Sequence, residues 1–162
     1  MYFRTVTAVA AGTRSERATT PTTAPDTTTT TSVQPARTGV EGEVEDAYLR
    51  SWDVYADAML RLDASRLEEA YSGPALLTRR DEVAQLAAGN TPVRVHVDHD
   101  YEIVVLNADD AFVLEDHVNH SVLLDGGTMQ PIEPDPNRVV RREYVLRKGS
   151  GGWRVAHVNA GS

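Results

Sequence analysis

The sequence contains no cysteine among its 162 residues. This absence excludes a disulfide framework, a zinc site built on thiolates and a cysteine nucleophile, although it does not fix the cellular compartment. Lysine is nearly absent as well, since fifteen of the sixteen basic residues are arginine and only Lys148 is a lysine. Together with the frequent alanine, valine and aspartate, this bias indicates a GC-rich bacterial genome, which is an inference about codon usage and not about physics.

Long apolar runs and positive charge are also scarce. No run approaches the ~18 apolar residues of a membrane-spanning helix. Residues 41–162 carry twelve basic and twenty-two acidic residues, a net charge of −10, whereas residues 1–40 have a net charge of +2. An acidic surface repels phosphate backbones, so we expect no nucleic-acid partner. The sequence contains no nucleophile elbow, phosphate loop or zinc-protease motif, and it implies no cofactor.

Residues 1–11 are apolar but short. The tripeptide Ala8-Val9-Ala10 fits the small-x-small pattern of a signal-peptide cleavage site. We interpret residues 1–11 as the remnant of a signal or anchor segment whose true start lies upstream. A tail without a targeting role is the alternative.

Residues 12–40 have the composition of a linker, because threonine fills nine of the thirteen positions from 19 to 31. Too few apolar side chains are present to offset the entropy of ordering this segment, so we expect it to be disordered. Thr/Pro-rich stalks commonly space a domain away from a surface. The two segments together favour an exported or surface-tethered protein with one folded domain at 41–162, and a cytoplasmic protein with a tail is the alternative.

The segment Glu41–Leu62 has the clearest helical periodicity in the chain. Its apolar or small residues recur at steps of three and one over about six turns, which is one face of an α-helix. That face carries Tyr48, Trp52 and Tyr55. We expect Trp52 to be buried between this helix and a sheet, while the alternative is that the three aromatic residues line a ligand pocket together with Tyr144.

Two shorter helices are expected next, over Arg66–Tyr71 and about Ala75–Ala88. Ser72-Gly73-Pro74 separates them and places a proline in the first turn of the second, and Gly89-Asn90 ends it. From Pro92 onward the apolar period changes to two, which is typical of strands.

Four antiparallel strands are expected, at about 93–105, 111–124, 138–148 and 153–158. His99-Asp100 interrupts the first alternation, which predicts a bulge or bend there. Helices followed by sequential antiparallel strands define the α+β class. The expected architecture is a long N-terminal helix and two shorter helices packed on a curled four-stranded sheet, whose other face stays open and could support a homodimer.

The strand 111–124 offers two faces that differ in polarity. The first contains Phe112, Leu114, Asp116, Val118 and His120, and we assign it to the core because it is the more apolar. The second contains Val113, Glu115, His117 and Asn119, and we assign it to a solvated, salt-bridged surface.

This assignment makes Asp116, His120 and Arg142 the polar residues of the core face, with Tyr144 nearby. An Asp–His pair in an apolar cavity can act as a general base with its orienting group, and an arginine can bind a substrate carboxylate. The alternative, which we favour, is a structural ion pair between Asp116 and Arg142 near the sheet rim.

Five histidines fall on expected strands: His96, His99, His117, His120 and His157. The two local pairs are each three residues apart, which points their members to opposite faces of a strand. Neither pair chelates by itself, so we predict no metal site.

Three segments carry a resemblance to a known fold. They are Tyr48-Leu49-Arg50-Ser51-Trp52, the segment Leu67–Leu76, and Tyr144–Lys148 running into Gly152-Trp153-Arg154-Val155. In this order the chain resembles the nuclear transport factor 2-like (cystatin-like) superfamily over residues 41–160. Within the second segment, Ser72-Gly73-Pro74-Ala75-Leu76 also looks like the intermembrane-space-type domain of plastid division proteins, a non-enzymatic relative.

The resemblance implies a cone-shaped ligand space between the sheet and the long helix. The superfamily includes ketosteroid isomerases, polyketide cyclases and dehydratases as well as many binding domains, so the fold does not choose among them. The catalytic set of the isomerases has no residue-by-residue match here. We therefore expect a non-enzymatic accessory domain that binds an unknown protein or small apolar ligand. The alternative is a small-molecule isomerase, cyclase or dehydratase acting in the cone.

Overall fold

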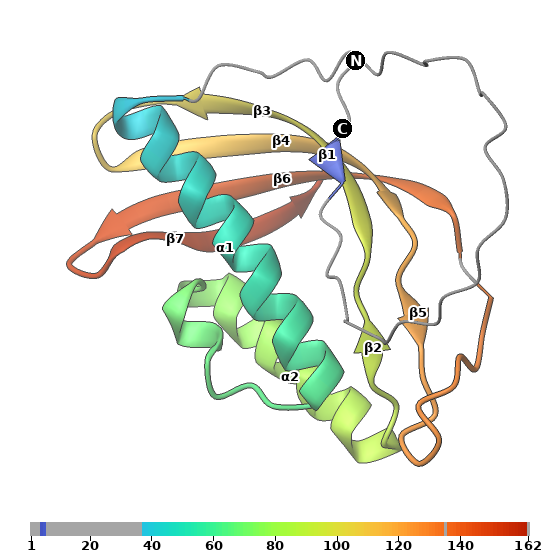
Figure 1. The fold of residues 1–162 in the computed structure, drawn as a ribbon. Helices are drawn as coiled ribbons and strands as arrows, with labels where there is room; N and C mark the ends of the chain where they lie inside the picture. The colour runs from blue at the N-terminus through green and yellow to red at the C-terminus, as the bar shows by residue number, and fades with distance from the viewer. Residues whose placement is uncertain (1–3, 6–36, 135, 162) are drawn as a thin grey trace, which may run out of the picture.

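The computed structural model describes residues 4–5, 37–134 and 136–161 (Figure 1). The expected signal remnant and linker lie outside these residues, except for positions 4–5 and 37–40. None of the described helices is long and apolar enough to cross a membrane.

Two α-helices and one short 3-10 helix form the helical part. They are α1 (Gly39–Arg61), η1 (Leu67–Glu69) and α2 (Gly73–Gly89). The helix expected over Arg66–Tyr71 is therefore a single 3-10 turn. α1 and α2 both end on a left-handed residue, Leu62 at φ 57° and Asn90 at φ 49°, which stops the helical hydrogen-bond ladder.

The described strands form two antiparallel sheets. The larger has the order β1-β3-β4-β6-β7, and the smaller pairs β2 with β5. Their bounds are Arg4–Thr5 (β1), Val93–Arg94 (β2), Val97–Val105 (β3), Asp110–Asn119 (β4), Val122–Leu123 (β5), Arg138–Gly149 (β6) and Gly152–Ala160 (β7). The expected α+β class is confirmed, whereas the expected count of four strands is wrong because the first two long strands are each interrupted and β1 joins the edge.

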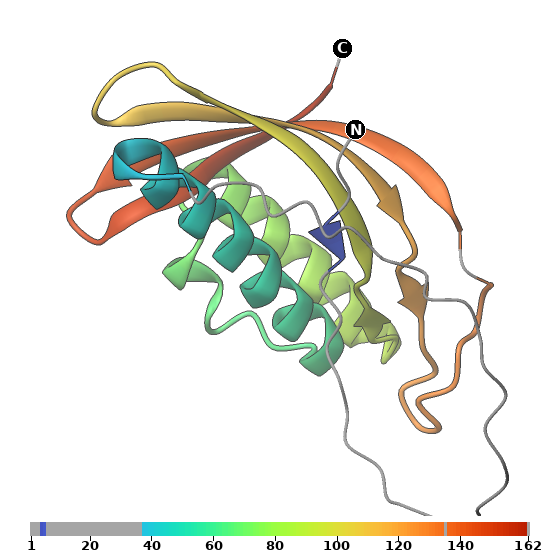
Figure 2. The same cartoon turned by 45° about the horizontal axis from the view of Figure 1, so that its top comes forward.

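The larger sheet curls around the helices. In Figures 1 and 2, α1 and α2 lie side by side under its concave face, while β2 and β5 extend the wall at the far end of α1. The core between these layers is rich in aromatic and aliphatic side chains, including Tyr48, Leu67, Tyr71, Tyr144, Leu146 and Val155. Tyr71, between η1 and α2, also donates a hydrogen bond to the Ser51 carbonyl on α1 at 2.9 Å, so this connection is held to α1 by a polar contact as well.

Strand β3 runs through His99 without a break. It pairs with β4 residue by residue from Val97 to Val105, so the bulge expected at His99-Asp100 is absent. A register shift occurs instead between Val145 and Leu146 on β6. His99 simply occupies an inward position in the alternation and is buried there.

The face assignment for β4 is wrong. The buried residues are Ala111, Val113, Glu115 and His117, while Leu114 is 42% exposed. The prediction assigned the more apolar face of β4 to the core, on the assumption that polar side chains face the solvent. Here a buried carboxylate and buried imidazoles satisfy one another, which removes most of the cost of desolvating them.

Candidate functional site

A buried carboxylate lies at the centre of the concave face. Glu115 on β4 is 1% exposed, and its Oε1 accepts hydrogen bonds from the Tyr48 hydroxyl and from His99 Nδ1. Its Oε2 accepts a hydrogen bond from His117 Nδ1 at 2.9 Å. We call Tyr48, His99, Glu115 and His117 the buried cluster.

The register of the strands builds this cluster. His99 on β3 lies directly opposite His117 on β4, and Glu115 is two residues from His117 on the same face. Tyr48 reaches down from α1. Trp52, one turn further along α1, contacts both imidazoles edge-on, with ring centroids 5.1 Å from His99 and 5.5 Å from His117.

The surroundings of Glu115 keep it ionised. Burial by itself raises the pKa of a carboxyl group, but hydrogen bonds from His117 and His99, the His117 charge and the Tyr48 hydrogen bond outweigh it and lower the pKa of Glu115 to about 2. Burial, and next the charge of Glu115, raise the pKa of Tyr48 and of Tyr144 far above 10. Both phenols therefore remain hydrogen-bond donors at neutral pH.

A cavity of about 350 Å³ lies beside this cluster, between α1 and the concave face. Its walls include the aromatic residues Trp52, Tyr55 and Tyr144 and a group of aliphatic residues from β2, β3 and β6. His117 and Arg142 supply polar atoms from the inner face of the sheet. The volume is at the lower end of the range for small-molecule sites.

The helix side of the cavity has a paired arginine. Arg79 on α2 forms an ion pair with Glu82 at 2.7 Å and stacks over the Tyr55 ring at 4.1 Å. The Tyr55 hydroxyl also donates to Glu82 at 3.2 Å. These contacts fix the Tyr55 ring against the cavity and neutralise both charges.

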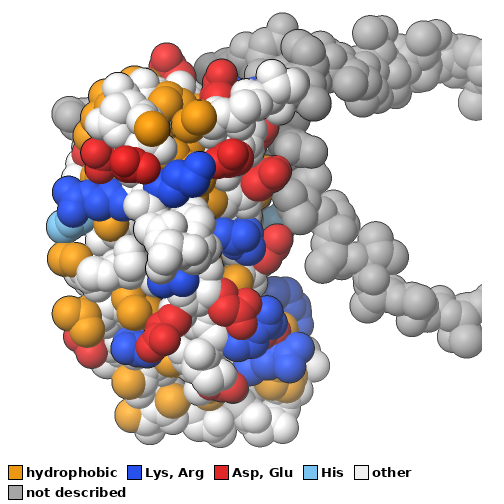
Figure 3. Space-filling model, turned by 90° about the vertical axis from the view of Figure 1, so that its left-hand side faces the viewer, with side chains coloured by type: hydrophobic (Ala, Val, Ile, Leu, Met, Phe, Trp, Pro, Cys, Tyr) orange, Lys and Arg blue, Asp and Glu red, His pale blue; other side chains and the backbone are white. Residues whose placement is uncertain are grey.

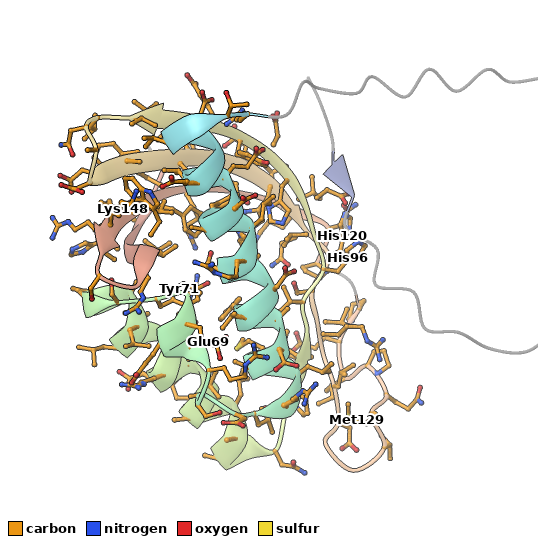
Figure 4. The ribbon with its side chains drawn as sticks, turned by 60° about the vertical axis from the view of Figure 1, so that its left-hand side comes forward. Glu69, Tyr71, His96, His120, Met129 and Lys148 are labelled. Carbon is orange, nitrogen blue, oxygen red and sulfur yellow. The ribbon has the colours of Figure 1, made fainter. Side chains whose placement is uncertain are left out.

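The three sequence-based catalytic candidates do not converge. Asp116 lies on the outer face, where Arg141 holds it with N–O distances of 2.6 and 2.8 Å. His120 lies just beyond β4, 3.5 Å from an Asp98 oxygen and next to His96 (Figure 4). The assignment of Asp116 to the core face is thus wrong, and so is its expected ion pair with Arg142.

The other candidates lie where a ligand could reach them. Arg142, Trp52, Tyr55 and Tyr144 all line the cavity. Tyr48 is fully buried beneath it and belongs to the buried cluster.

The sequence reading missed the three polar residues at the centre, His99, Glu115 and His117. One signal was available, because continuing the odd-numbered alternation of Val93, Val95 and Val97 through residue 99 places His99 inside. His99 on β3 lies opposite His117 on β4. Residue spacing within a single strand could therefore not predict that these two side chains lie close together. Within the described residues, no group of three or more His, Cys, Asp or Glu side chains is arranged to hold a metal ion.

The face of the molecule that Figure 3 shows has no patch formed by one kind of side chain. Acidic, basic and hydrophobic side chains are interspersed over that face. A second hollow, of about 410 Å³, lies on the outer face of the sheet and is lined mostly by charged side chains. The cavity beneath α1, with its aromatic wall, is the better candidate for a ligand site.

A similar fold occurs in solved structures. The intermembrane space region of chloroplast protein ARC6 is similar with a TM-score of 0.61 at 16% identity, over 76% of this chain and 97% of that chain. At this identity the likeness concerns the fold alone.

Two further solved structures are similar with a TM-score of 0.45. One is a domain of unknown function with a cystatin-like fold from Nostoc punctiforme, at 16% identity over 71% of this chain and 74% of that chain. The other is an NTF2-like protein from Cytophaga hutchinsonii, at 19% identity over 72% and 97%. Both are described with the nuclear transport factor 2-like (cystatin-like) fold that the sequence resembles. The expected likeness to the intermembrane-space-type domain of plastid division proteins is confirmed at the level of the fold by the ARC6 structure. No family model and no curated protein matches the sequence.

Proposed function

We propose that the chain carries a non-enzymatic accessory domain that holds a small ligand in the cavity beneath α1. The observation that supports this most is the cavity of about 350 Å³ with its wall of Trp52, Tyr55 and Tyr144. Aromatic and aliphatic walls with a few polar groups are typical of ligand sites.

The state of Glu115 argues against a carboxylate-based reaction. A general base works best when its pKa lies near the operating pH. The pKa of Glu115 is lowered to about 2, and all of its described hydrogen-bond partners come from inside the protein. Glu115 therefore stabilises the fold and positions its neighbours, and it is a poor base for a ligand.

We propose further that this domain stands outside the cytoplasm on a stalk. The Thr/Pro-rich composition of residues 12–40 and the Ala8-Val9-Ala10 pattern support this location. A similar fold forms the intermembrane space region of chloroplast protein ARC6, and this likeness supports the proposed location.

A second candidate function is proton transfer by His117. Its Nδ1 lies 2.9 Å from Glu115 Oε2, and the same side chain lines the cavity, where an imidazole can exchange a proton with a ligand. A base held by a second group is the arrangement that an isomerase or dehydratase needs. This candidate replaces the expected Asp116–His120 pair with Glu115 and His117.

Deuterium exchange separates the two functions. Phenylpyruvate has a carboxylate, a ring and an enolisable methylene group, whose protons exchange in D₂O and are followed by NMR. The binding function predicts the same exchange rate with and without the full-length chain. Acceleration that is lost in His117→Gln and kept in His120→Gln would instead establish the enzymatic function.

A thermal-shift screen tests ligand binding directly. The full-length chain is screened against lipids, steroids, peptides and small amphipathic acids, and a ligand at 100 times its Kd should add about 2.7 kcal/mol of stability. The shift should vanish in Val140→Trp, which fills the cavity, and persist in Val139→Trp, whose side chain points outward and is 70% exposed. Equal shifts in both variants would contradict binding in this cavity.

A further inference from the structure

Arg142 is the charged residue of the sheet that faces the cavity from within. It lies on β6 between Val140 and Tyr144 in the inward alternation, and all three line the cavity. The preceding residue, Arg141, points to the opposite face and is held there by Asp116. Two adjacent arginines thus have opposite environments.

The charge of Arg142 has no carboxylate partner among the described residues. Its register neighbour on β4 is Glu115, but that carboxylate accepts hydrogen bonds from Tyr48, His99 and His117 instead. Within the described residues, Nη1 of the guanidinium donates one long hydrogen bond, of 3.4 Å, to the Arg141 carbonyl oxygen. Most of its donors therefore remain available to an atom that enters the cavity.

The other charges around the cavity compensate one another. Arg79 is paired with Glu82. At the exposed rim, Glu133 and Arg138 contribute one charge of each sign. Glu115 adds a negative charge next to the cavity, but Tyr48, His99 and His117 donate hydrogen bonds to both of its oxygens. Arg142 is therefore the charged group of the interior whose hydrogen-bond donors can meet an entering anion.

The walls near Arg142 suit a flat apolar body. Trp52 and Tyr55 meet edge-to-face with ring centroids 6.0 Å apart, and Trp52 lies 6.1 Å from the Tyr144 ring. Aliphatic side chains of Val97 and Val140 complete the surface. A ligand with one aromatic ring or two fused rings can bury its ring faces here while its polar group reaches the Arg142 guanidinium.

We infer that the cavity selects small aromatic carboxylates and that Arg142 binds their carboxylate group. A guanidinium presents two parallel N–H donors that match a carboxylate, and such charge-assisted pairs are strong when partly buried. This inference rests on the proposed ligand-binding function and specifies its ligand class.

Isothermal titration with 2-naphthoate and 2-naphthamide tests the inference on the full-length chain. The two probes share the ring and differ in the charge of the polar group. Naphthoate should bind about ten- to hundredfold more tightly than naphthamide, because a hydrogen bond to a charged group is stronger than one between neutral groups. Arg142→Gln should remove this preference, and Arg141→Gln, which changes net charge equally, should keep it.

Each outcome bears on the inference. Equal affinity of the two probes for the wild-type chain would overturn it, as would an equal loss of preference in Arg141→Gln and Arg142→Gln. Equal affinities that are abolished by Val140→Trp would leave the proposed ligand binding standing without the carboxylate preference. If Arg142→Gln fails to fold by circular dichroism, Arg142→Lys replaces it, and a retained full preference there would contradict bidentate binding.

Discussion

At the scale of single residues, Glu115 determines how the concave face is built. It accepts hydrogen bonds from three side chains on α1, β3 and β4. Removing one partner of a buried charged network leaves the others unsatisfied, which is costly. The same contacts make the stability of the fold depend on pH in an acidic window.

The pKa of Glu115 predicts that window. Its folded-state pKa of about 2 lies below its ordinary value of 4.5, so its stabilisation is fully present above pH 4.5 and is lost as the pH falls toward 2. The shift corresponds to about 3 kcal/mol. Urea unfolding of wild type and Glu115→Gln between pH 7 and pH 2.5 should show a stability difference that narrows as the pH falls. A difference that stays constant would contradict an ionised, buried Glu115.

Trp52 is the second residue with a large expected effect. It is half-buried and contacts Tyr55, His99, His117 and Tyr144. The expected place of Trp52 between helix and sheet is therefore right, whereas its side chain is less buried than expected. We predict that Trp52→Ala lowers the free energy of unfolding by about 3 kcal/mol, at the lower end for core aromatics because one side faces the cavity. A loss below about 1 kcal/mol in urea unfolding would show that these ring contacts contribute little.

How far the sequence predicts these residues depends on their chemistry. The aromatic stripe of α1 follows from helical periodicity, and three of the four aromatic pocket candidates line the cavity. The valine alternation before His99 places that residue inside, but Glu115 and His117 could not be placed by hydrophobicity, because hydrogen bonds among the three polar side chains stabilise their burial. The same error misplaced Asp116. Residues alternate between the two faces of a strand, so a wrong assignment of the inward face of β4 reverses the position of every residue on it.

At the scale of elements, the turn after β5 packs against the end of α2. A Cβ atom added to Gly126 would lie 2.3 Å from the Asn90 carbonyl oxygen, whereas one added to Gly127 would meet its nearest neighbour, an Asp125 oxygen, at 3.4 Å. The first distance is possible only for glycine. The helix end, which the sequence predicted from Gly89-Asn90, is thus also a docking point for a loop.

This contact gives a matched pair of variants. We predict that Gly126→Ala destabilises the fold by about 1–3 kcal/mol, because backbone at the end of α2 must move. Gly127→Ala should change stability by less than about 0.5 kcal/mol. Thermal unfolding of both variants decides the matter, and similar melting temperatures would contradict the close approach.

At the scale of the whole molecule, we propose that the independently folding domain begins at about residue 37. The described contacts of the N-terminal part with the domain include the two-residue strand β1 on β3. Arg37 forms an ion pair with Glu41 at 3.3 Å and lies over the Tyr101 ring, 5.6 Å from its centroid. Two residues added to a sheet edge contribute little to a cooperative fold.

Removal of residues 1–36 should therefore leave the domain intact. We predict that a chain starting at Arg37 melts within about 2 °C of the full-length chain, since a change of 1 kcal/mol shifts the melting temperature by roughly 4 °C at this size. Scanning calorimetry measures both chains under the same conditions. A drop of more than about 5 °C would show that the N-terminal residues are part of the folded unit.

The central claim is that a ligand occupies the cavity beneath α1. The chain has two tryptophans, and Trp52 lines this cavity while Trp153 is buried elsewhere, with its indole N–H donating to Glu43 at 3.1 Å. The most direct measurement is the ¹H–¹⁵N spectrum of the two indole N–H groups during titration with the compound that raises the melting temperature most in the screen. We predict that the Trp52 resonance shifts in a saturable manner and that the Trp153 resonance does not. Saturation without a change at Trp52, or with a change at Trp153 alone, would contradict binding in this cavity.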